Sequence, residues 1–510
     1  MMMEFTLFDQ ESNTKLRLLH MLFKKGDWYT IEELVTDSRY DRNTVLKYSR
    51  ILQEEIATVT FLDSKATLDR SKTQGLRFQG DKISYRDVVS QLVGNSFSFS
   101  LLRDLFLKKE VSIDQFSAEH FVSESSIRRK LTQLNKSFEP HGFSFRTVRR
   151  QIRSEGSETQ LRYYGYIFFW DIYRGVSWPF KAVSEEKITH VINDEISALS
   201  RLKHVSIAQW SYMIALNLTR FSMGYQLEKS DIPEYAHDLN QTFYHSGPTL
   251  AAAMKEAFNF SIIEIDFLVL LFQIGTHFFL IDDLFERAMN FHQTRQTLVF
   301  ELYQLYLSVL QPDLEALNEE DQLLYKSLIL ATFMRSALFP TYEMTVSSYD
   351  YFAFFSSKFP ALVHEMVTQL ERMQRHTDFD LIKIKTFLVP RMCEAYALIG
   401  RLTDFDTPIR IKLETDLPIV LERILGNQLT AALSTFYSIS VISTTRFLEE
   451  PYDLVVASTV SATLKQLRDV PIVVINPEIN EIDLANIAKA IEQLRAQKKN
   501  HDNLTGGMLP

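Results

Sequence analysis

Hydrophobic and polar positions follow a helical period over most of the first 57 residues. The spacing predicts three helices, over residues 15–25, 31–36 and 42–56, with Thr30 as the N-cap of the second. The tight connection before the third helix is typical of a helix-turn-helix unit. Residues 59–80 then alternate short apolar runs with Lys, Arg and Gly75, as expected of a two-stranded wing. We therefore expect a winged helix-turn-helix domain over residues 1–82.

The same arrangement recurs about 80 residues later. Helices are expected over residues 99–108, 113–121 and 123–138, with Ser112 capping the second and Gly142 stopping the third. Strand-like alternation over residues 143–156 predicts a second wing. This wing has a basic edge without an acid before Glu155, formed by Arg146, Arg149, Arg150 and Arg153. A second winged domain is expected over residues 83–160.

The rest of the chain predicts a mainly α-helical, multidomain protein. Nearly unbroken amphipathic helix follows, which we divide into two all-α bundles, residues 161–287 and 288–403, with a seam near 286–292. After Asp404 short apolar runs at 409–413, 439–443, 454–457 and 472–475 alternate with helical segments, the last over 484–494. They predict a small parallel α/β domain over residues 407–497, followed by a frayed tail, 498–510.

Charge separates the winged region from the remainder. Residues 1–160 hold 25 Lys and Arg against 22 Asp and Glu, whereas residues 161–510 hold 30 against 42. The net charges are +3 and −12, and together they give the −9 of the chain. Only the first part is therefore expected to attract a polyanion such as duplex DNA.

Each third helix of a winged domain has an inward apolar face and an outward face suited to a major groove. In the first, Val45, Leu52 and Ile56 share the inward face. The outward candidates for DNA contact are Arg42, Asn43, Thr44, Lys47 and Arg50. In the second, Ile127, Leu131, Leu134 and Phe138 lie inward. Its candidates are Ser125, Arg128, Arg129, Lys130, Thr132 and Lys136, with Arg146, Arg149 and Arg150 from the wing.

Two segments carry a resemblance to a known family, DRNTVLKYSRILQEEI in the first recognition helix and SESSIRRKLTQLNKSFEPHGF in the second. Together with the two-bundle region, they resemble the Mga/AtxA family of virulence regulators of Gram-positive bacteria. The resemblance covers nearly the whole chain. It implies tandem winged domains, two PTS-regulation bundles, a terminal domain similar to enzyme IIB of the sugar phosphotransferase system, and a homodimer. Because the terminal domain lacks the enzyme IIB cysteine, we expect it to serve as the dimer contact instead.

In the family the bundles can be switched by histidine phosphorylation, and this chain departs from the usual pattern. The segment 213–224 around Arg220 has no His, and the position two turns after Glu264 is Leu271. His204 and His277 are the nearest phosphoacceptor candidates, with general phosphotransferase proteins as the implied partners. A helix-embedded His with aromatic neighbours, such as His277, is more often a packed residue.

No enzymatic chemistry is indicated. The strand at 409–413 is followed by Glu414-Thr415-Asp416 rather than by the phosphotransfer cysteine of enzyme IIB, and the single cysteine, Cys393, precedes that domain. Phosphate-binding loops, zinc motifs and nucleophile elbows are lacking, so neither a cofactor nor a metal is implied. The longest apolar run, 267–281, has 15 residues, against about 20 for a membrane span. With no export signal, a cytoplasmic protein without a membrane contact is expected.

Two binding functions remain, with a phosphotransferase enzyme as a third that needs the missing cysteine. The first is a DNA-binding transcription regulator whose bundles respond to carbohydrate phosphotransferase status. The alternative is a PTS-regulated RNA-binding antiterminator, which also pairs such bundles with a nucleic-acid module. Antiterminators use a short, strand-rich RNA-binding domain, whereas residues 1–160 predict a long helical region with two helix-turn-helix units. The sequence therefore favours the regulator.

Overall fold

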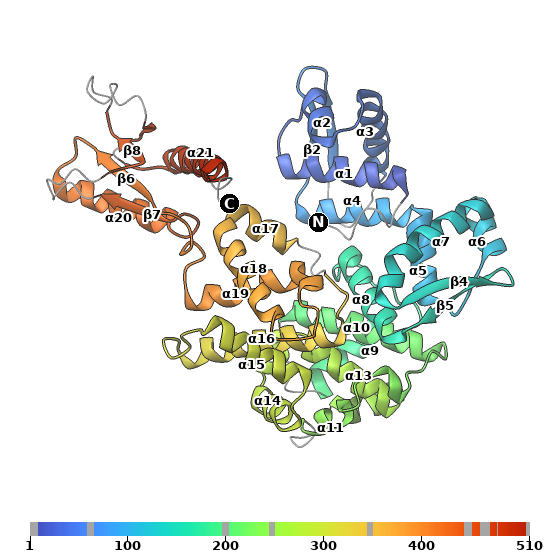
Figure 1. The fold of residues 1–510 in the computed structure, drawn as a ribbon. Coiled ribbons are helices and arrows are strands. Elements are labelled where there is room, and N and C mark those ends of the chain that lie inside the picture. The colour runs from blue at the N-terminus through green and yellow to red at the C-terminus, as the bar shows by residue number, and fades with distance from the viewer. Residues whose placement is uncertain are drawn as a thin grey trace. The chain divides into compact units, whose positions relative to one another are not determined.

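The computed structural model describes residues 9–58, 66–195, 203–243, 250–343, 350–442, 451–459, 470–476 and 478–505. The protein is mainly helical (Figure 1). It divides into two compact units, the first Met1–Glu301 with Leu330–Asp350 and the second Leu302–Ile329 with Tyr351–Pro510. Each unit is described by itself. In the described part of the chain, no helix has both the length and the apolarity needed to cross a membrane.

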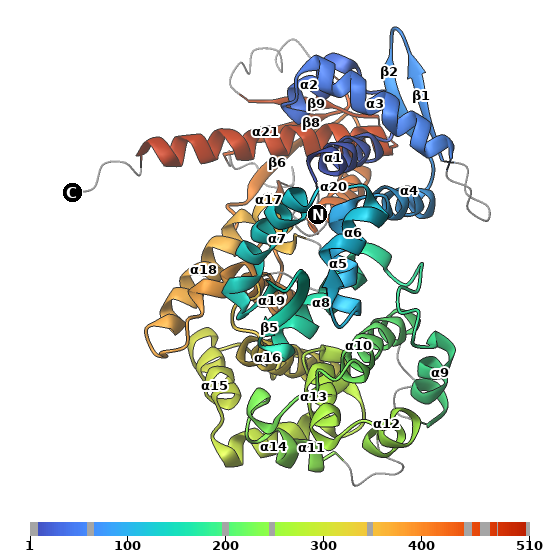
Figure 2. The same ribbon diagram turned by 90° about the vertical axis from the view of Figure 1, so that its right-hand side faces the viewer.

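The chain begins with the expected winged helix. Its elements are α1 (Gln10–Lys25), α2 (Ile31–Ser38), α3 (Arg42–Ala57), β1 (Thr67–Ser71) and β2 (Gly75–Gln79). Thr30 caps α2 as predicted, through a capping box in which Thr30 and Glu33 satisfy each other's backbone amides. Figure 2 shows the β1–β2 hairpin beside α3. Gly75 has a φ of 94°, and a Cβ there would meet the carbonyl oxygen of Tyr29, so the start of β2 requires glycine. The part of the predicted wing at 59–65 lies outside the described residues.

The second winged domain follows with one helix that the sequence did not predict, α4 (Lys82–Gly94). It continues with α5 (Phe97–Leu107), β3 (Val111–Ser112), α6 (Ile113–His120), α7 (Glu124–Phe138), β4 (Phe143–Val148) and β5 (Gln151–Gly156). The sheet order is β3-β5-β4, with antiparallel pairs. Ser112 and Ser123 cap α6 and α7, as expected.

The two helix-turn-helix units repeat each other residue by residue. The same offset of 82 residues relates Ile31 to Ile113 at the start of the eight-residue helix and Arg42 to Glu124 at the start of the recognition helix. It also relates Arg39 to Phe121, which end the shorter helices in the left-handed region with φ of 60° and 53°. The internal repeat predicted from the pattern is thus present in the structure.

The core of the second winged domain continues into the next helix, α8 (Glu158–Tyr173). The ring of Phe106 in α5 lies near those of Phe138 and Phe145 in the winged domain, and near Tyr164 and Phe168 in α8, with centroids 5.8 to 6.4 Å apart. All five side chains are buried. A cut at residue 160 would expose these rings, so the predicted boundary there does not separate two independent cores.

The remaining helices of the first unit range from 6 to 19 residues. They are α9 (Glu185–His190), α10 (His204–Ser222), α11 (Ala236–Gln241), α12 (Leu250–Phe258), α13 (Ile262–Gln273) and α14 (Leu284–Arg295). α13 is the buried apolar helix expected from the run 267–281, but it ends at Gln273, and a 3-10 helix (Thr276–Leu280) follows. The seam expected at 286–292 lies within α14, because no Gly or Pro interrupts that segment.

α15 (Leu298–Leu310) and α16 (Glu319–Leu338) span the boundaries between the two units. The helices of the second unit are α17 (Tyr351–Lys358), α18 (Pro360–Gln374), α19 (Lys385–Ile399), α20 (Ile419–Leu433) and α21 (Glu481–Thr505). Its four strands are β6 (Ile409–Glu414), β7 (Ile439–Ile442), β8 (Leu454–Ala457) and β9 (Ile472–Val474).

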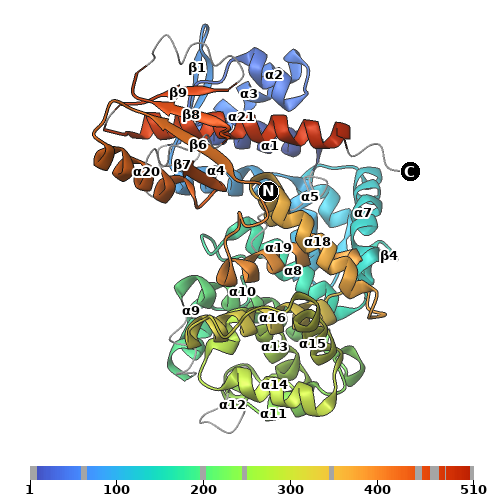
Figure 3. The same cartoon turned by 60° about the vertical axis from the view of Figure 1, so that its left-hand side comes forward.

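The predicted parallel strands of the second unit are present. They form a sheet in the order β7-β6-β8-β9, and every described pair is parallel. Figure 3 shows α20 and α21 with this sheet, and Leu413, Leu429, Leu454 and Ile491 belong to its shared core. The last helix runs to Thr505 rather than to Leu494, because no Gly or Pro lies between Leu494 and Gly506 to end it. Residues 506–510 of the predicted tail and Ser443 lie outside the described residues.

Candidate nucleic-acid interface

The first recognition helix, α3, is fixed at its start by its N-cap. Asp41 accepts hydrogen bonds from the hydroxyl and the backbone amide of Thr44, the latter at 3.0 Å, and these bonds lower the pKa of the Asp41 carboxyl. Val45, Leu52 and Ile56 are buried as predicted. α3 is therefore held by its buried side chains and its cap, while its opposite face stays exposed.

On that exposed face the cations differ in whether an acid neutralises them. Arg42 pairs with Glu32, and Arg50 pairs with Glu54 at 3.1 Å. Lys47 is exposed, and its ammonium lies 5.0 Å from the ring centroid of the adjacent Tyr48. Within the described residues no acid pairs with Lys47. Asn43 is also exposed, so the face combines a free cation with an amide near the helix start.

The second recognition helix, α7, has the same organisation. Ile127, Leu131, Leu134 and Phe138 are buried, as predicted. On the opposite face Ser125, Arg128, Arg129, Thr132 and Lys136 are exposed. Glu124 forms an ion pair with Arg128 at 2.7 Å, and the Thr132 hydroxyl donates a hydrogen bond to the backbone carbonyl oxygen of Arg128 at 3.0 Å. For Arg129 and Lys136 the described part of the chain provides no acidic partner.

Lys130 is the one residue of α7 that the prediction placed wrongly. Its side chain is buried, with 5% of the residue exposed, and its ammonium lies 3.4 Å from the amide oxygen of Gln133. Burial lowers the pKa of Lys130 to about 8, although the negative charge of Asp9 partly opposes this. Lys130 lies three residues after Ile127 and four before Leu134, so it belongs to the inward stripe. It is not available to DNA.

The tip of the second wing is formed by two arginines in a conformation that arginine rarely adopts. Arg149 and Arg150 connect β4 and β5 with φ of 48° and 68°. Arg150 forms ion pairs with Asp114 and, at 2.8 Å, with Glu124, and both acids raise its pKa. It therefore attaches the wing to α6 and α7. Arg149 is exposed and has no acidic partner among the described residues.

The other wing arginines are neutralised, which the sequence did not indicate. Arg146 pairs with Glu155 at 3.1 Å, and the guanidinium of Arg153 donates to Glu110 at 2.8 Å. The expected basic edge is thus reduced to Arg149. The first wing adds two cations that the prediction omitted, Arg70 and Lys72, both exposed and without a described partner. Their only signal in the sequence was the alternating pattern of residues 66–80.

A buried ionic network connects the second wing to the helical region. Arg220 of α10 donates to the hydroxyl of Ser154 in β5 at 2.9 Å and pairs with Glu158 at 2.7 Å. Arg162 of α8 also contacts Glu158, at 2.9 Å, and forms a two-contact pair with Glu264 of α13. Both arginine side chains are fully buried. Removing either partner of such a pair would leave a buried charge, so this network holds the wing rigidly on the bundle.

The two candidate histidines both lie near Lys203. His204 follows it as the first residue of α10. Partial burial of the His277 ring is the larger cause of its lowered pKa, and the positive charge of the Lys203 ammonium is the smaller one. Both histidines are exposed. His277 lies in the 3-10 helix rather than within an apolar helix, so the expectation of a packed His277 is wrong. In contrast, His292 is fully buried, and burial lowers its pKa to about 4.

Comparison with known proteins gives a family match to the second helix-turn-helix unit. Residues 81–169 match the model of the Mga helix-turn-helix domain, and the match therefore extends into α8. A protein of Streptococcus pneumoniae serotype 4 named as a trans-acting regulator is 24% identical over 226 residues, 44% of this chain and 44% of that protein. The anthrax toxin expression trans-acting positive regulator of Bacillus anthracis is 20% identical over 275 residues, 51% of this chain and 54% of that protein. The chain is thus similar to the Mga helix-turn-helix family over residues 81–169, and to named trans-acting regulators over about half of its length.

The match to these relatives is partial. The chain spans about half of the length of the two relatives just named. The family model covers the second winged domain and most of α8, and the first winged domain lies before its matched range. The 82-residue offset nevertheless gives the first domain the same helix-turn-helix geometry.

The cysteine and the possible metal ligands are the remaining groups of chemical interest. Cys393 is buried in α19, and burial raises its pKa to about 12, so it stays a thiol at neutral pH. Among the described residues, His, Cys, Asp and Glu do not gather into a group that could hold a metal ion.

Proposed function

We propose that the protein is a DNA-binding transcription regulator that contacts duplex DNA through both α3 and α7. The observation that carries the proposal is the equivalence of Lys47 and Arg129. They are related by the 82-residue offset, both are exposed, and both lack a described acidic partner. Selection for a phosphate contact explains why each unit has a free cation at this position, while neighbouring arginines are neutralised.

The residues beside these cations are suited to reading base edges. Asn43 and Ser125 occupy equivalent positions in the first turns of α3 and α7, where recognition helices approach the major groove. An amide and a hydroxyl both donate and accept hydrogen bonds, so they can distinguish base pairs. Thr44, Thr132 and Lys136 extend the contact surface, and Arg149 at the wing tip reaches the flanking backbone. The already paired Arg42, Arg50, Arg128, Arg146 and Arg150 support this surface.

The conformation at the wing tip supports a contact made by Arg149. Two consecutive non-glycine residues with positive φ cost on the order of 1 to 3 kcal/mol each, and Asn-Gly would relieve that cost. The ion pairs of Arg150 compensate for part of it and fix the direction of the tip. Arg149 is thereby held away from the protein on a rigid support, as a phosphate contact requires.

Homodimerisation through the terminal α/β domain is the second part of the proposal. The first two turns of α20 expose Ile419, Val420, Leu421 and Ile424, with 65%, 68%, 49% and 47% of each residue accessible. Four neighbouring apolar side chains exposed on one helix are typical of an association surface. A two-fold dimer would present two pairs of recognition helices to two half-sites.

Carbohydrate control through the helical region is the third part. His204 and His277 are exposed and lie near one lysine, so phosphoryl transfer from a general phosphotransferase protein would meet no steric barrier from the described residues. The Arg220 guanidinium is not available to bind the phosphoryl group, because it already pairs with Glu158 and donates a hydrogen bond to Ser154. Phosphorylation would add about −1.5 to −2 charges to a region that is already negative and would oppose association.

The proposal is tested by measuring the affinity of the full chain for genomic duplexes and for RNA of the same sequences. Fluorescence anisotropy at several salt concentrations gives both the affinity and the number of phosphate contacts. A DNA-binding regulator prefers a subset of duplexes, and that preference persists against competitor DNA. Preferential binding to structured RNA would favour the antiterminator instead and would contradict the proposal.

A further inference from the structure

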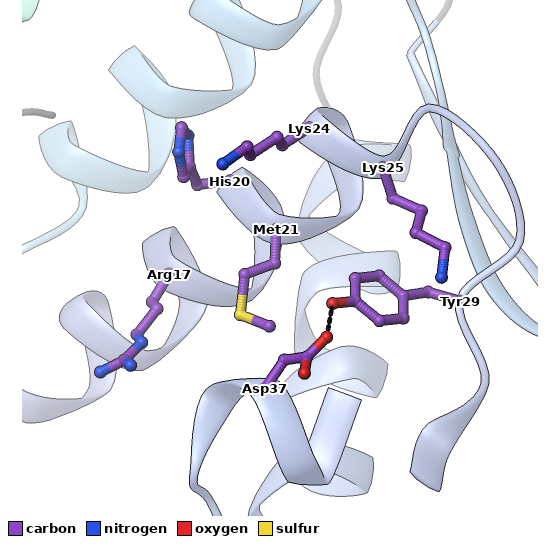
Figure 4. Close-up of a pocket in the computed structure, with 7 residues that line it drawn as sticks. All are labelled: Arg17, His20, Met21, Lys24, Lys25, Tyr29 and Asp37. Carbon is purple, nitrogen blue, oxygen red and sulfur yellow. Dashed lines mark hydrogen bonds between the residues drawn. The ribbon is translucent and has the colours of Figure 1, made fainter. Parts of the chain in front are cut away.

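A concave, positively charged pocket lies on the first winged domain, away from the exposed face of α3. Its volume is about 600 Å³, within the range of small-molecule sites of roughly 300 to 1,000 Å³. Figure 4 shows that its side chains come from α1, from Tyr29 before α2, and from Asp37 of α2. No residue of α3 lines it. The pocket is therefore separate from the proposed major-groove contacts.

The cations of the pocket follow the helical spacing of α1. Arg17, His20 and Lys24 lie three or four residues apart, so they share one face of the helix, and Lys25 lies at its end. Arg17 and Lys24 are exposed and have no acidic partner among the described residues. Burial and then surrounding positive charges, among them that of Lys24, lower the pKa of His20. Arg17 and Lys24 therefore keep their positive charges unneutralised by the described acids.

The acidic groups near the pocket are occupied. The Asp37 carboxylate accepts a hydrogen bond from the Tyr29 hydroxyl, and Glu33 pairs with Lys25 at 3.0 Å. The Lys25 ammonium lies 4.3 Å from the centroid of the Tyr29 ring. Met21 adds apolar surface between Arg17 and Lys24. The pocket therefore has cations at one side and an apolar wall formed by Met21 and the Tyr29 ring.

We propose that this pocket binds a small organic phosphate, with Arg17 and Lys24 holding the phosphate group and with Met21 and Tyr29 packing against the organic part. Two cations without described acidic partners favour a dianionic phosphate over a single carboxylate, which carries only one charge. The same side chains could instead contact a phosphate of the DNA backbone, and the two sources share one chemistry. Concavity favours the small molecule, because duplex DNA approaches exposed helices and wings rather than pockets of this depth.

A ligand bound here would act on the DNA-reading unit itself. The Arg17 guanidinium lies 5.5 Å from the centroid of the Tyr40 ring, and Tyr40 lies in the turn between α2 and α3. Asp37 belongs to α2, the helix that precedes this turn. A phosphate that engages Arg17 therefore competes with a contact to the turn that positions α3.

Isothermal titration calorimetry of the full chain tests the site with three probes: phenyl phosphate, inorganic phosphate and phenol. We expect saturable one-to-one binding of phenyl phosphate, weaker binding of inorganic phosphate and no binding of phenol. The double variant Arg17→Ala/Lys24→Ala should weaken phenyl phosphate binding on the order of tenfold or more, since each lost charged contact contributes modestly at an exposed site. Lys181→Ala/Lys229→Ala removes two exposed lysines outside the pocket and is the matched control, with unchanged binding expected.

The outcomes separate the two phosphate sources. Absence of binding to both anions overturns the proposal, as does equal binding by the pocket variant and the wild type. In another outcome, the wild-type protein does not bind phenyl phosphate and the pocket variant loses duplex affinity and salt dependence. That result assigns the cations to the DNA backbone and also overturns the proposal. Equal melting temperatures and circular dichroism spectra of the two double variants establish that lost binding does not come from unfolding.

Discussion

Replacing Lys47 and Arg129 by alanine tests whether each recognition helix contributes a phosphate contact. Both cations are exposed and lack described acidic partners, so their removal frees no buried acid and leaves both helix caps intact. For duplex DNA, the logarithm of the binding constant falls with that of the salt concentration by about 0.9 per phosphate contact. On a duplex with one half-site, which a single protomer occupies, each single variant should therefore lower the salt slope by about 0.9.

The same relation gives the expected loss of affinity. If the electrostatic contribution vanishes near 1 M salt, one contact is worth a factor of about eight at 0.1 M, which corresponds to about 1.2 kcal/mol. Lys47→Ala and Arg129→Ala should each weaken binding about eightfold at 0.1 M salt. Because the two residues lie on different helices, the double variant should weaken it by about sixtyfold.

The matched control is Arg128→Ala on the same helix as Arg129. Arg128 already pairs with Glu124, so its removal changes a neutralised pair rather than a free charge. Its salt slope should change by well under half as much as that of Arg129→Ala. Fluorescence anisotropy on one duplex between 50 and 300 mM salt measures all five proteins, namely the wild type, the three single variants and the double variant. Unchanged slopes for Lys47→Ala and Arg129→Ala, or an equal effect of the control, would refute the assignment.

The remaining predictions concern stability, assembly and control. Burial lowers the folded pKa of Lys130 to about 8 from an ordinary 10.5, so the unfolded chain binds more protons between these values, and stability should rise by up to about 3 kcal/mol from pH 8 to pH 10.5. Lys130→Met should remove this rise, which urea unfolding of both proteins at pH 7.5 and pH 10 measures; an identical pH dependence would contradict the burial of its ammonium. Ile419→Glu should convert dimers into monomers in light scattering, while Glu481→Gln, an exposed change elsewhere in the same domain, should not; a dimeric Ile419→Glu variant places the interface elsewhere. Incubation with phosphoenolpyruvate and the general phosphotransferase proteins should introduce acid-labile phosphate that His204→Ala or His277→Ala removes, and an unlabelled wild-type protein would end the proposal of phosphorylation control.

Local features of the fold could be predicted from the sequence. The caps at Thr30, Ser112 and Ser123 and the apolar stripes of α3 and α7 depend on residues within one or two turns. The strands of the terminal sheet also have short apolar runs of their own. The caps and the apolar stripes recur at a constant offset in the two winged units, and for this reason the sequence alone indicates the repeat.

Features that depend on distant residues could not be predicted in the same way. The acids that neutralise Arg150 and Arg153 precede these arginines by 26 to 43 residues, so the sequence of the wing alone predicts a basic edge. The shared core of Phe106 with α8 joins segments that the amphipathic pattern separated. Lys130 is different, because its spacing from Ile127 and Leu134 already placed it on the inward stripe. This spacing predicts a buried side chain, whereas the charge of lysine alone predicts an exposed one.

Hydroxyl-radical footprinting on a selected genomic duplex tests the central claim most directly, namely that α3 and α7 both contact DNA. The wild-type protein should protect two groups of backbone positions for each protomer. Lys47→Ala should weaken one group and Arg129→Ala the other, while Arg128→Ala should leave both in place. A single protected group that only one of the variants alters, or protection that neither alters, would contradict binding through two equivalent recognition helices.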